Sequence, residues 1–142
     1  MTIRALASAT QLVADAHETI ENLTAAQLAD ELHHPGVVLV DLREQDEREV
    51  DGVIPGSVHI PSGMLAFCAD PALPIHAEEL DPRRRIILYC ALGKRSVLAA
   101  LTLKAIGFHN IAHLDGGYAS WRHGSGAIEP PPPAGPTKEL RT

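Results

Sequence analysis

Residues 85–107 read RIILYCALGKRSVLAALTLKAIG, and in this stretch a strand pattern gives way to a helix pattern at one cysteine. The first five residues are a short apolar run with β-branched and aromatic members, as expected of a strand buried on both faces. After the cysteine, apolar residues recur at spacings of three and four and predict a helix that ends at Gly107. Cys90 is therefore expected where a central strand turns into a helix. The predicted apolar stripe of that helix comprises Val97, Leu98, Leu101, Ala105 and Ile106.

The turn after Cys90 is suited to holding an anion. Gly93 permits a backbone conformation that other residues resist, so successive N–H groups can point at whatever the Cys90 sulfur carries. The N-terminus of a helix favours negative charge, and Lys94 and Arg95 add two cations. Because the thiolate is the reactive form of cysteine, these features indicate that Cys90 is a nucleophile. At this point an inert cysteine in a buried core remains the alternative, since cysteine is often buried.

Residues 37–40, Val-Val-Leu-Val, form a second apolar run with β-branched character. Asp41 follows this run directly, and Arg43 lies two residues further on. In open α/β sheets the functional groups lie beyond the carboxyl ends of the strands, a position that Asp41 and Cys90 share. We therefore expect Asp41 near the loop of Cys90, whereas Arg43, on the residues alone, is compatible with a solvated surface charge.

The motifs together resemble those of the rhodanese-like sulfurtransferases. They follow the order of that family from about residue 24 to residue 121. In one of these motifs, the segment 52–61, Val53 stands where the family usually has histidine, and Ser57 stands where alanine is common. The resemblance rests on Val-Asp-Leu-Arg-Glu at 40–44, the Gly-His-Ile-Pro-Gly-Ala-like segment 52–61, Cys-x-x-Gly-x-Arg-Ser at 90–96, and Gly116-Gly117 with Trp121.

The resemblance implies a sulfurtransferase that needs no metal or organic cofactor. Cys90 would attack the sulfane sulfur of a small anionic donor such as thiosulfate, become a persulfide, and pass the outer sulfur to a thiol or cyanide-like acceptor. Asp41 would support the active-site loop. The substrate-binding residues would be Ala91, Leu92, Gly93, Lys94, Arg95, Ser96 and Arg43.

Two other functions stay open. One is a cysteine-dependent phosphatase or arsenate reductase on the same scaffold, and the other is a non-catalytic rhodanese-like module that binds a partner. Four residues separate Cys90 from Arg95, whereas the loop of phosphatase-like relatives resembles Cys, five residues and then Arg. A shorter ring of N–H donors suits a single sulfur atom. The presence of Cys90 argues against the binding module.

Alternating strand and helix signals predict an α/β fold with a small, mainly parallel five-stranded sheet and helices on both faces. Residues 1–22 are expected to form an N-terminal helical extension with an amphipathic helix over 3–19, which packs on its own domain or joins two copies in a homodimer. Residues 23–125 would be the rhodanese-like domain, and 126–142 a proline-rich extended tail. Shorter elements are expected at 20–23, 25–32, 44–50, 58–60, 64–68 and 110–114, with a last helix that carries Trp121.

The composition excludes several classes of partner. A net charge of −6 and few aromatic residues argue against nucleic acids and anionic membranes as ligands. No apolar run approaches the roughly 20 residues of a membrane helix. Two cysteines in 142 residues suit a reducing cytoplasm, where a thiol can remain reactive. A cytoplasmic protein is therefore expected.

Three further features bear on the active site: Cys68, the histidines and the loop at 70–74. Cys68 has apolar neighbours and no adjacent cation, so we expect a core residue and not a resolving thiol. Among eight histidines, only His109 and His113 show a spacing of four with strand or loop character, and no third ligand completes a site, so no metal site is predicted. The loop at 70–74 is expected to overhang the active site.

Overall fold

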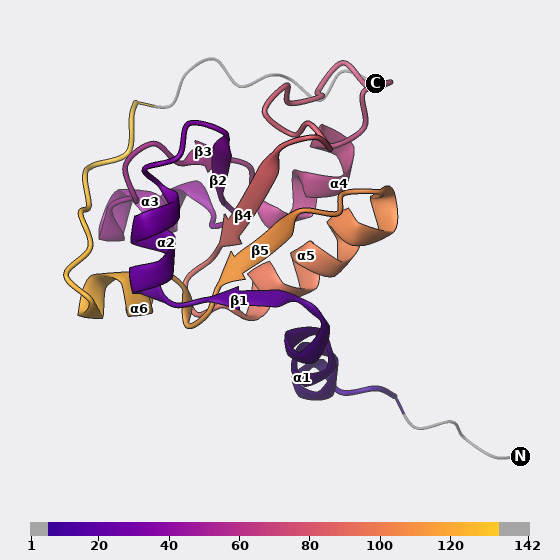
Figure 1. Cartoon of the computed structure of the whole chain (residues 1–142), viewed down its shortest axis with the longest axis horizontal. Helices are drawn as coiled ribbons and strands as arrows, with labels where there is room; N and C mark the ends of the chain where they lie inside the picture. Colours follow the sequence, from indigo (N-terminus) through magenta and orange to yellow (C-terminus); the bar gives the residue numbers. More distant parts are fainter. Residues whose placement is uncertain (1–5, 134–142) are drawn as a thin grey trace, which may run out of the picture.

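The computed structural model describes residues 6–133 and has a five-stranded sheet at its centre (Figure 1). The strand order is β1-β5-β4-β2-β3, and every pair of neighbouring strands is parallel. The predicted α/β fold with a small parallel sheet is confirmed. The strands are β1 (Glu21–Leu23), β2 (Val37–Asp41), β3 (Val58–His59), β4 (Arg85–Tyr89) and β5 (Ile111–Leu114).

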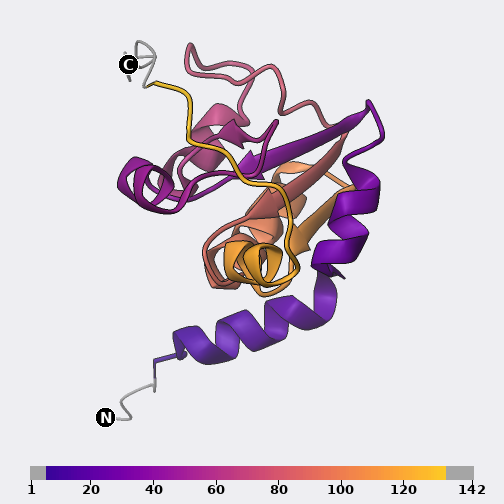
Figure 2. The ribbon, with the colours of Figure 1, turned by 90° about the vertical axis from the view of Figure 1, so that its left-hand side faces the viewer.

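Helices cover both faces of the sheet (Figures 1 and 2). One face packs against α1, α4 and α5, and the opposite face packs against α2 and α6. A short 3-10 turn at Ser62–Met64 precedes α4. Between residues 6 and 133, no helix is both long and apolar enough to span a membrane. The helices are α1 (Ala9–Thr19), α2 (Ala25–Glu31), α3 (Gln45–Asp51), α4 (Leu65–Cys68), α5 (Lys94–Ile106) and α6 (Gly117–His123).

The two apolar runs of the sequence form the central strands β2 and β4. Side chains along a strand alternate between the two faces. In β4, Ile86 and Leu88 contribute to the core beneath α5, whereas Ile87 and Tyr89 contribute to the core beneath α6. All four are fully buried, which explains why β4 is a continuous apolar run. Cys90 follows at the carboxyl end of this strand.

The N-terminal helix α1 begins at Ala9, later than the predicted start at residue 3. Ser8 is the N-cap of α1, because its hydroxyl accepts a hydrogen bond from the N–H of Gln11 at 3.0 Å. Residues 3–5 lie outside the described residues. Ala16 and Ile20 are buried in the core beside α5, so α1 packs on its own domain. The homodimer through α1 stays a prediction, which sedimentation can check.

The buried face of α5 differs from the predicted stripe. Leu101 and Ile106 are 38% and 45% exposed. The helix packs against both the sheet and α1, and its buried face includes the small residues Ser96, Ala99 and Ala100. Gly107 ends the helix with a φ of +126°, as predicted. The buried positions of α5 are Ser96, Val97, Ala99, Ala100 and Leu103.

The segment after α6 is tied to the domain further than the predicted boundary at residue 125. Val53 and Glu129 form an antiparallel bridge through two backbone hydrogen bonds of 2.8 and 3.0 Å. The indole N–H of Trp121 donates to the carbonyl of Ala127 at 2.8 Å. The position where the family usually has histidine thus carries a valine that is 2% exposed and holds the C-terminal segment through its backbone. Residues 134–142 of the predicted tail lie outside the described residues.

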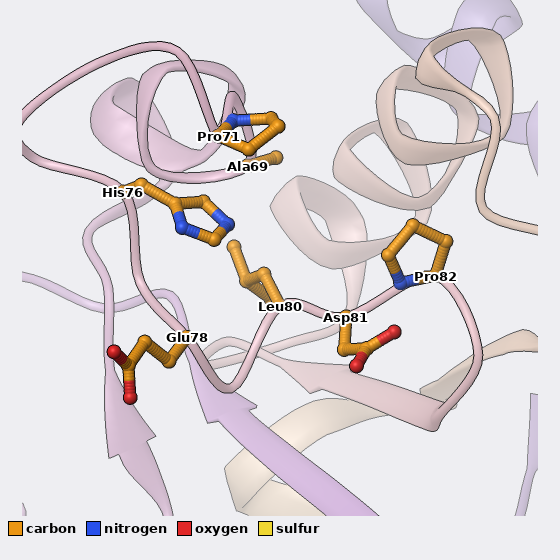
Figure 3. A pocket seen from close by; sticks show the side chains of 7 residues that line it. All are labelled: Ala69, Pro71, His76, Glu78, Leu80, Asp81 and Pro82. Carbon is orange, nitrogen blue, oxygen red and sulfur yellow. The ribbon is translucent and has the colours of Figure 1, made fainter.

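The loop between α4 and β4 does not overhang Cys90, contrary to expectation. It leads into the amino end of β4, whereas Cys90 follows the carboxyl end (Figure 1). Cys68, just before this loop, is 7% exposed and belongs to the core, as predicted. The loop encloses a separate pocket of about 290 Å³, shown in Figure 3. The pocket is lined by Ala69, Pro71, His76, Glu78, Leu80, Asp81 and Pro82.

Candidate active site

The Cys90 sulfur lies in a ring of backbone N–H groups at the N-terminus of α5. Its Sγ accepts hydrogen bonds from the N–H of Gly93 at 3.2 Å and from the N–H of Ser96 at 3.4 Å, and we call these two donors the sulfur cradle. Gly93 has a φ of +92°, which turns its N–H toward the sulfur. The thiol is only 1% exposed. The cradle and the start of the helix both favour negative charge on the sulfur.

Backbone hydrogen bonds join the loop that carries Cys90 to the start of α6. The N–H of Tyr118 donates to the carbonyl of Cys90 at 2.8 Å, and the N–H of Ala119 donates to the carbonyl of Ala91 at 3.1 Å. Gly117 makes this approach possible, because a Cβ at that position would lie 2.6 Å from backbone atoms of Cys90 and Ala91. The Gly116-Gly117 motif therefore serves the active-site loop by allowing two backbones to meet.

Asp41 is a fully buried anchor beneath the loop. Its carboxylate accepts hydrogen bonds from the backbone N–H and Nε of Arg43, both at 3.0 Å, and from the second guanidinium nitrogen at 2.8 Å. Arg48 adds a contact of 3.2 Å, and the hydroxyl of Tyr89 donates at 2.8 Å. Burial raises the pKa of Tyr89, and Asp41 adds to the rise, so the hydroxyl keeps its proton. Because Tyr89 directly precedes Cys90, the network supports the loop-anchoring role predicted for Asp41.

Arg43 is 1% exposed, and its backbone N–H, Nε and Nη2 donate hydrogen bonds inside the protein. Besides Asp41, it donates to the carbonyl of Gly52 at 2.8 Å, and its guanidinium carbon lies 4.2 Å from the ring centre of Tyr118. Burial alone would lower the pKa of Arg43, but the hydrogen bonds to Asp41 raise it above its ordinary value. Arg43 therefore stays charged, and its Nε and Nη2 are held by Asp41 and Gly52. The structure places it next to Asp41, and the substrate contact predicted for Arg43 stays a prediction.

The two cations after the loop have different surroundings. Arg95 donates to both carboxylate oxygens of Glu47 at 2.9 and 2.8 Å, and this pairing lowers the pKa of Glu47 to about 2. No chemical role was predicted for Glu47, which lies in the first turn of α3, where the helix dipole favours an acidic residue. Lys94 is exposed, and no residue between 6 and 133 forms an ion pair with it. Lys94 is thus the available positive charge at the rim of the loop, while Leu92 beside it is 61% exposed.

Three polar side chains, Ser96, His113 and Asn22, continue the hydrogen bonding from the Cys90 sulfur, and the sequence predicted only Ser96. The hydroxyl oxygen of Ser96 is 3.6 Å from Cys90 Sγ and 2.9 Å from His113 Nδ1. His113 Nε2 is 2.7 Å from Asn22 Oδ1. His113 could have been noticed as the one polar side chain in the buried strand Ile-Ala-His-Leu. No local pattern marks Asn22, which reaches His113 because β1 pairs with β5.

The structure also gathers three potential metal ligands that the sequence had not grouped. His17, His113 and Asp115 offer ligand atoms within 4.8 Å of one another, whereas the sequence had paired His113 with His109. Both ring nitrogens of His113 are already hydrogen bonded, and His17 Nε2 lies 3.2 Å from Asp115 Oδ1. His113 therefore has no free nitrogen for a metal ion.

Comparison with protein families agrees with the fold and the loop. The model of the rhodanese-like domain matches residues 24–123. The chain belongs to the rhodanese-like family. The matched range includes the sulfur cradle, the Asp41 anchor and the Gly116-Gly117 motif, but it excludes α1 and Asn22.

The similar proteins include two that are named sulfurtransferases and several that are named tRNA uridine(34) hydroxylases. A thiosulfate:glutathione sulfurtransferase from Saccharomyces cerevisiae is 34% identical over 103 residues, covering 68% of this rhodanese-like chain and 73% of the relative. A sulfurtransferase from Allochromatium vinosum is 32% identical over 95 residues, covering 66% of this chain and 80% of the relative. A solved structure from Rhodopseudomonas palustris, described as a protein of unknown function and possible tyrosine phosphatase, is 36% identical with a TM-score of 0.84 and covers 91% of this chain and 99% of that chain. The chain is thus a member of a sulfur-transfer family.

Proposed function

We propose that this rhodanese-like protein moves a sulfane sulfur from a thiosulfate-like donor to a thiol or cyanide-like acceptor through a persulfide on Cys90. The observation that carries the proposal is the sulfur cradle, in which the N–H groups of Gly93 and Ser96 lie 3.2 and 3.4 Å from Cys90 Sγ. Donors fixed around a sulfur stabilise the negative charge that a thiolate or persulfide carries there.

Both steps are displacements at sulfur. The Cys90 thiolate attacks the outer sulfur of thiosulfate, a new S–S bond forms, and the bond to the sulfite group breaks as sulfite leaves with its electron pair. The acceptor then attacks the outer persulfide sulfur, and Cys90 leaves as a thiolate. Neither step needs a redox cofactor or a metal, because the electron pairs move with the sulfur groups. Lys94, at the rim of the loop, would attract the anionic donor.

Sulfur transfer competes with phosphate hydrolysis as the proposed activity, because a structural neighbour is described as a possible tyrosine phosphatase. The loop favours sulfur on two grounds. Only four residues separate Cys90 from Arg95, and the guanidinium of Arg95 is engaged by Glu47 through two hydrogen bonds. A phosphatase needs an arginine that is free to hold the phosphoryl oxygens.

We therefore expect Cys90-dependent sulfur transfer from thiosulfate and negligible hydrolysis of an aryl phosphate. The measurement is the ratio of the two activities on wild-type protein, with Cys90→Ser as the blank. Phosphate release that depends on Cys90 and exceeds sulfur transfer would establish the phosphatase instead.

Replacing Lys94 should separate charged from neutral donors. Lys94→Ala removes the exposed cation beside the loop, so kcat/KM for the thiosulfate dianion should fall about tenfold while that for a neutral persulfide donor, from which a thiol leaves, changes little. Raising the ionic strength should weaken thiosulfate use by the wild type in the same direction. Lys104→Ala, an exposed lysine near the other end of α5, is the matched control. An equal loss for both donors would mean that Lys94 does not recruit the anion.

The cytoplasm is the compartment that we propose. A persulfide mechanism needs Cys90 as a thiol between turnovers, and the reducing pools of that compartment keep thiols in this form.

A further inference from the structure

A continuous chain of hydrogen bonds, buried except at its last, part-buried step, runs from the Cys90 thiol to the N-terminal extension. It passes from Cys90 Sγ to the Ser96 hydroxyl at 3.6 Å, to His113 Nδ1 at 2.9 Å, and from His113 Nε2 to Asn22 Oδ1 at 2.7 Å. Cys90, Ser96 and His113 are each no more than 1% exposed. We call these four residues the relay. Its last member lies before residue 24, where the match to the family begins.

The hydrogen bonds of Asn22 determine which group donates at each step of the relay. The side-chain N–H of Asn22 donates to the carbonyl of His17 at 2.9 Å, so the amide oxygen of Asn22 must face His113. A carbonyl oxygen only accepts, and His113 Nε2 therefore carries the ring hydrogen. In the neutral ring, Nδ1 is then an acceptor and takes the hydrogen of the Ser96 hydroxyl at 2.9 Å, a shorter distance than the 3.2 Å to the Gly93 carbonyl, which is the other acceptor of this hydroxyl. The lone pairs of the Ser96 oxygen are left for the S–H of Cys90.

We propose that His113 accepts the proton of the Cys90 thiol through Ser96, so that the nucleophile is activated by an internal base. This proposal rests on the function proposed above only in naming Cys90 as the nucleophile. His113 touches neither the reacting sulfur nor the donor. It acts as a positioning residue for the Ser96 hydroxyl and as the place where the proton is held.

The proton balance closes within the relay. As the sulfur attacks, the S–H hydrogen moves to the Ser96 oxygen and the Ser96 hydrogen moves to His113 Nδ1. The S–H bond of Cys90 gives its electron pair to the thiolate, and the imidazole becomes an imidazolium. The new ion donates from Nδ1 to Ser96 and from Nε2 to Asn22, while the Ser96 hydroxyl donates to the thiolate. Every hydrogen bond of the relay is kept, with its direction reversed between Cys90 and His113.

The groups around His113 determine its protonation state. Burial lowers the pKa of His113 to about 4, with Asp115 opposing the change and His17 adding to it. The lowered pKa keeps the His113 ring neutral near pH 7 while Cys90 is a thiol, and it also makes the ring a weaker base, so the proton transfer depends on the negative charge that forms on the sulfur. The charged or titratable groups that face the relay are His17 from α1, Asp115 after β5, Cys90 itself, and Arg95 from α5, which interacts with Cys90 electrostatically. A thiolate on Cys90 stabilises the imidazolium, because an opposite charge nearby favours the charged form.

The experiment follows alkylation of Cys90 by iodoacetamide, a neutral reagent, between pH 5 and pH 9. Mass spectrometry of the peptide that contains Cys90 gives the rate constant at each pH. With an internal base, the wild-type rate constant should level off and change less than about threefold between pH 5 and pH 7. In His113→Asn the side-chain amide can still accept from Ser96 but cannot take the proton. Its rate constant should fall about tenfold per pH unit, or about 100-fold over the same interval.

Ser96→Ala is the second variant, because it breaks the relay while leaving the backbone N–H of the cradle in place. It should show the same steep fall, and it keeps the test decisive should His113→Asn fail to fold. A tenfold fall per pH unit in the wild type, or a level profile retained in a folded variant, would overturn the proposal. A purely structural role for His113 would change the rate at every pH without changing the slope. Alkylation needs no sulfur donor, so failure of thiosulfate transfer would leave this result standing.

Discussion

Protein carrying Cys90→Ser should take up no sulfur from thiosulfate, whereas the wild type gains the mass of one sulfur atom. The serine hydroxyl can occupy the cradle and accept from the N–H groups of Gly93 and Ser96, so the fold should be unchanged. An alcohol is far less nucleophilic than a thiolate, and we expect transfer to fall about 10³-fold or more. Intact mass after incubation with thiosulfate, together with the transfer rate, measures both effects.

The control for this variant is Cys68→Ser, since Cys68 is the other cysteine of the chain. Because its side chain belongs to the core and is 7% exposed, its replacement should leave sulfur loading in place. Equal loading of Cys90→Ser and the wild type would show that Cys90 is not the persulfide carrier. Loading without turnover in Cys68→Ser would mean that Cys68 resolves the persulfide.

Removal of the Asp41 carboxylate should give the largest loss of stability. Asp41→Ala leaves the guanidinium groups of Arg43 and Arg48 buried, at 1% and 4% exposure, without the acceptor that they share. Breaking a buried pair by removing one partner costs about 3–5 kcal/mol in the free energy of unfolding. Urea unfolding should show a lower midpoint with an unchanged slope.

Two further variants identify the cause of that loss. Asp30→Ala removes an exposed carboxylate from α2 and should change the free energy of unfolding by no more than about 0.5 kcal/mol. Asp41→Ala combined with Arg43→Met removes one of the two buried charges that the single variant leaves unpaired, and part of the stability should return. If the single and double variants are equally unstable, the uncompensated charge of Arg43 is not the reason for the loss.

The sheet and the loop were predictable because local pattern and global position agree there. The apolar run at 86–89 indicates burial on both faces, and Asp41 and Cys90 each follow such a run, so the topology brings them to one end of the sheet. The capping box of Thr24 and Gln27 likewise marks the start of α2 in the sequence and in the structure.

What the sequence did not reveal depends on contacts between distant segments. Arg43 reads as a surface charge until Asp41, Gly52 and Tyr118 are seen to enclose it. The ion pair of Glu47 with Arg95 joins residues 48 positions apart. The stripe on α5 was misplaced because α1 covers one side of this helix, and that cover is not encoded in the spacing of its own apolar residues. Tertiary packing decided each of these cases.

The strand order has a consequence for the behaviour of the protein at high concentration. The outer strands are β1 with three residues and β3 with two, while the longer strands lie between them. An unpaired strand edge is a template on which another chain can add, and short edges offer few free N–H and C=O groups. Pro61 lies just beyond β3 and has no N–H with which to extend that edge. The fold thereby protects its sheet from intermolecular β-pairing and aggregation without closing it into a barrel.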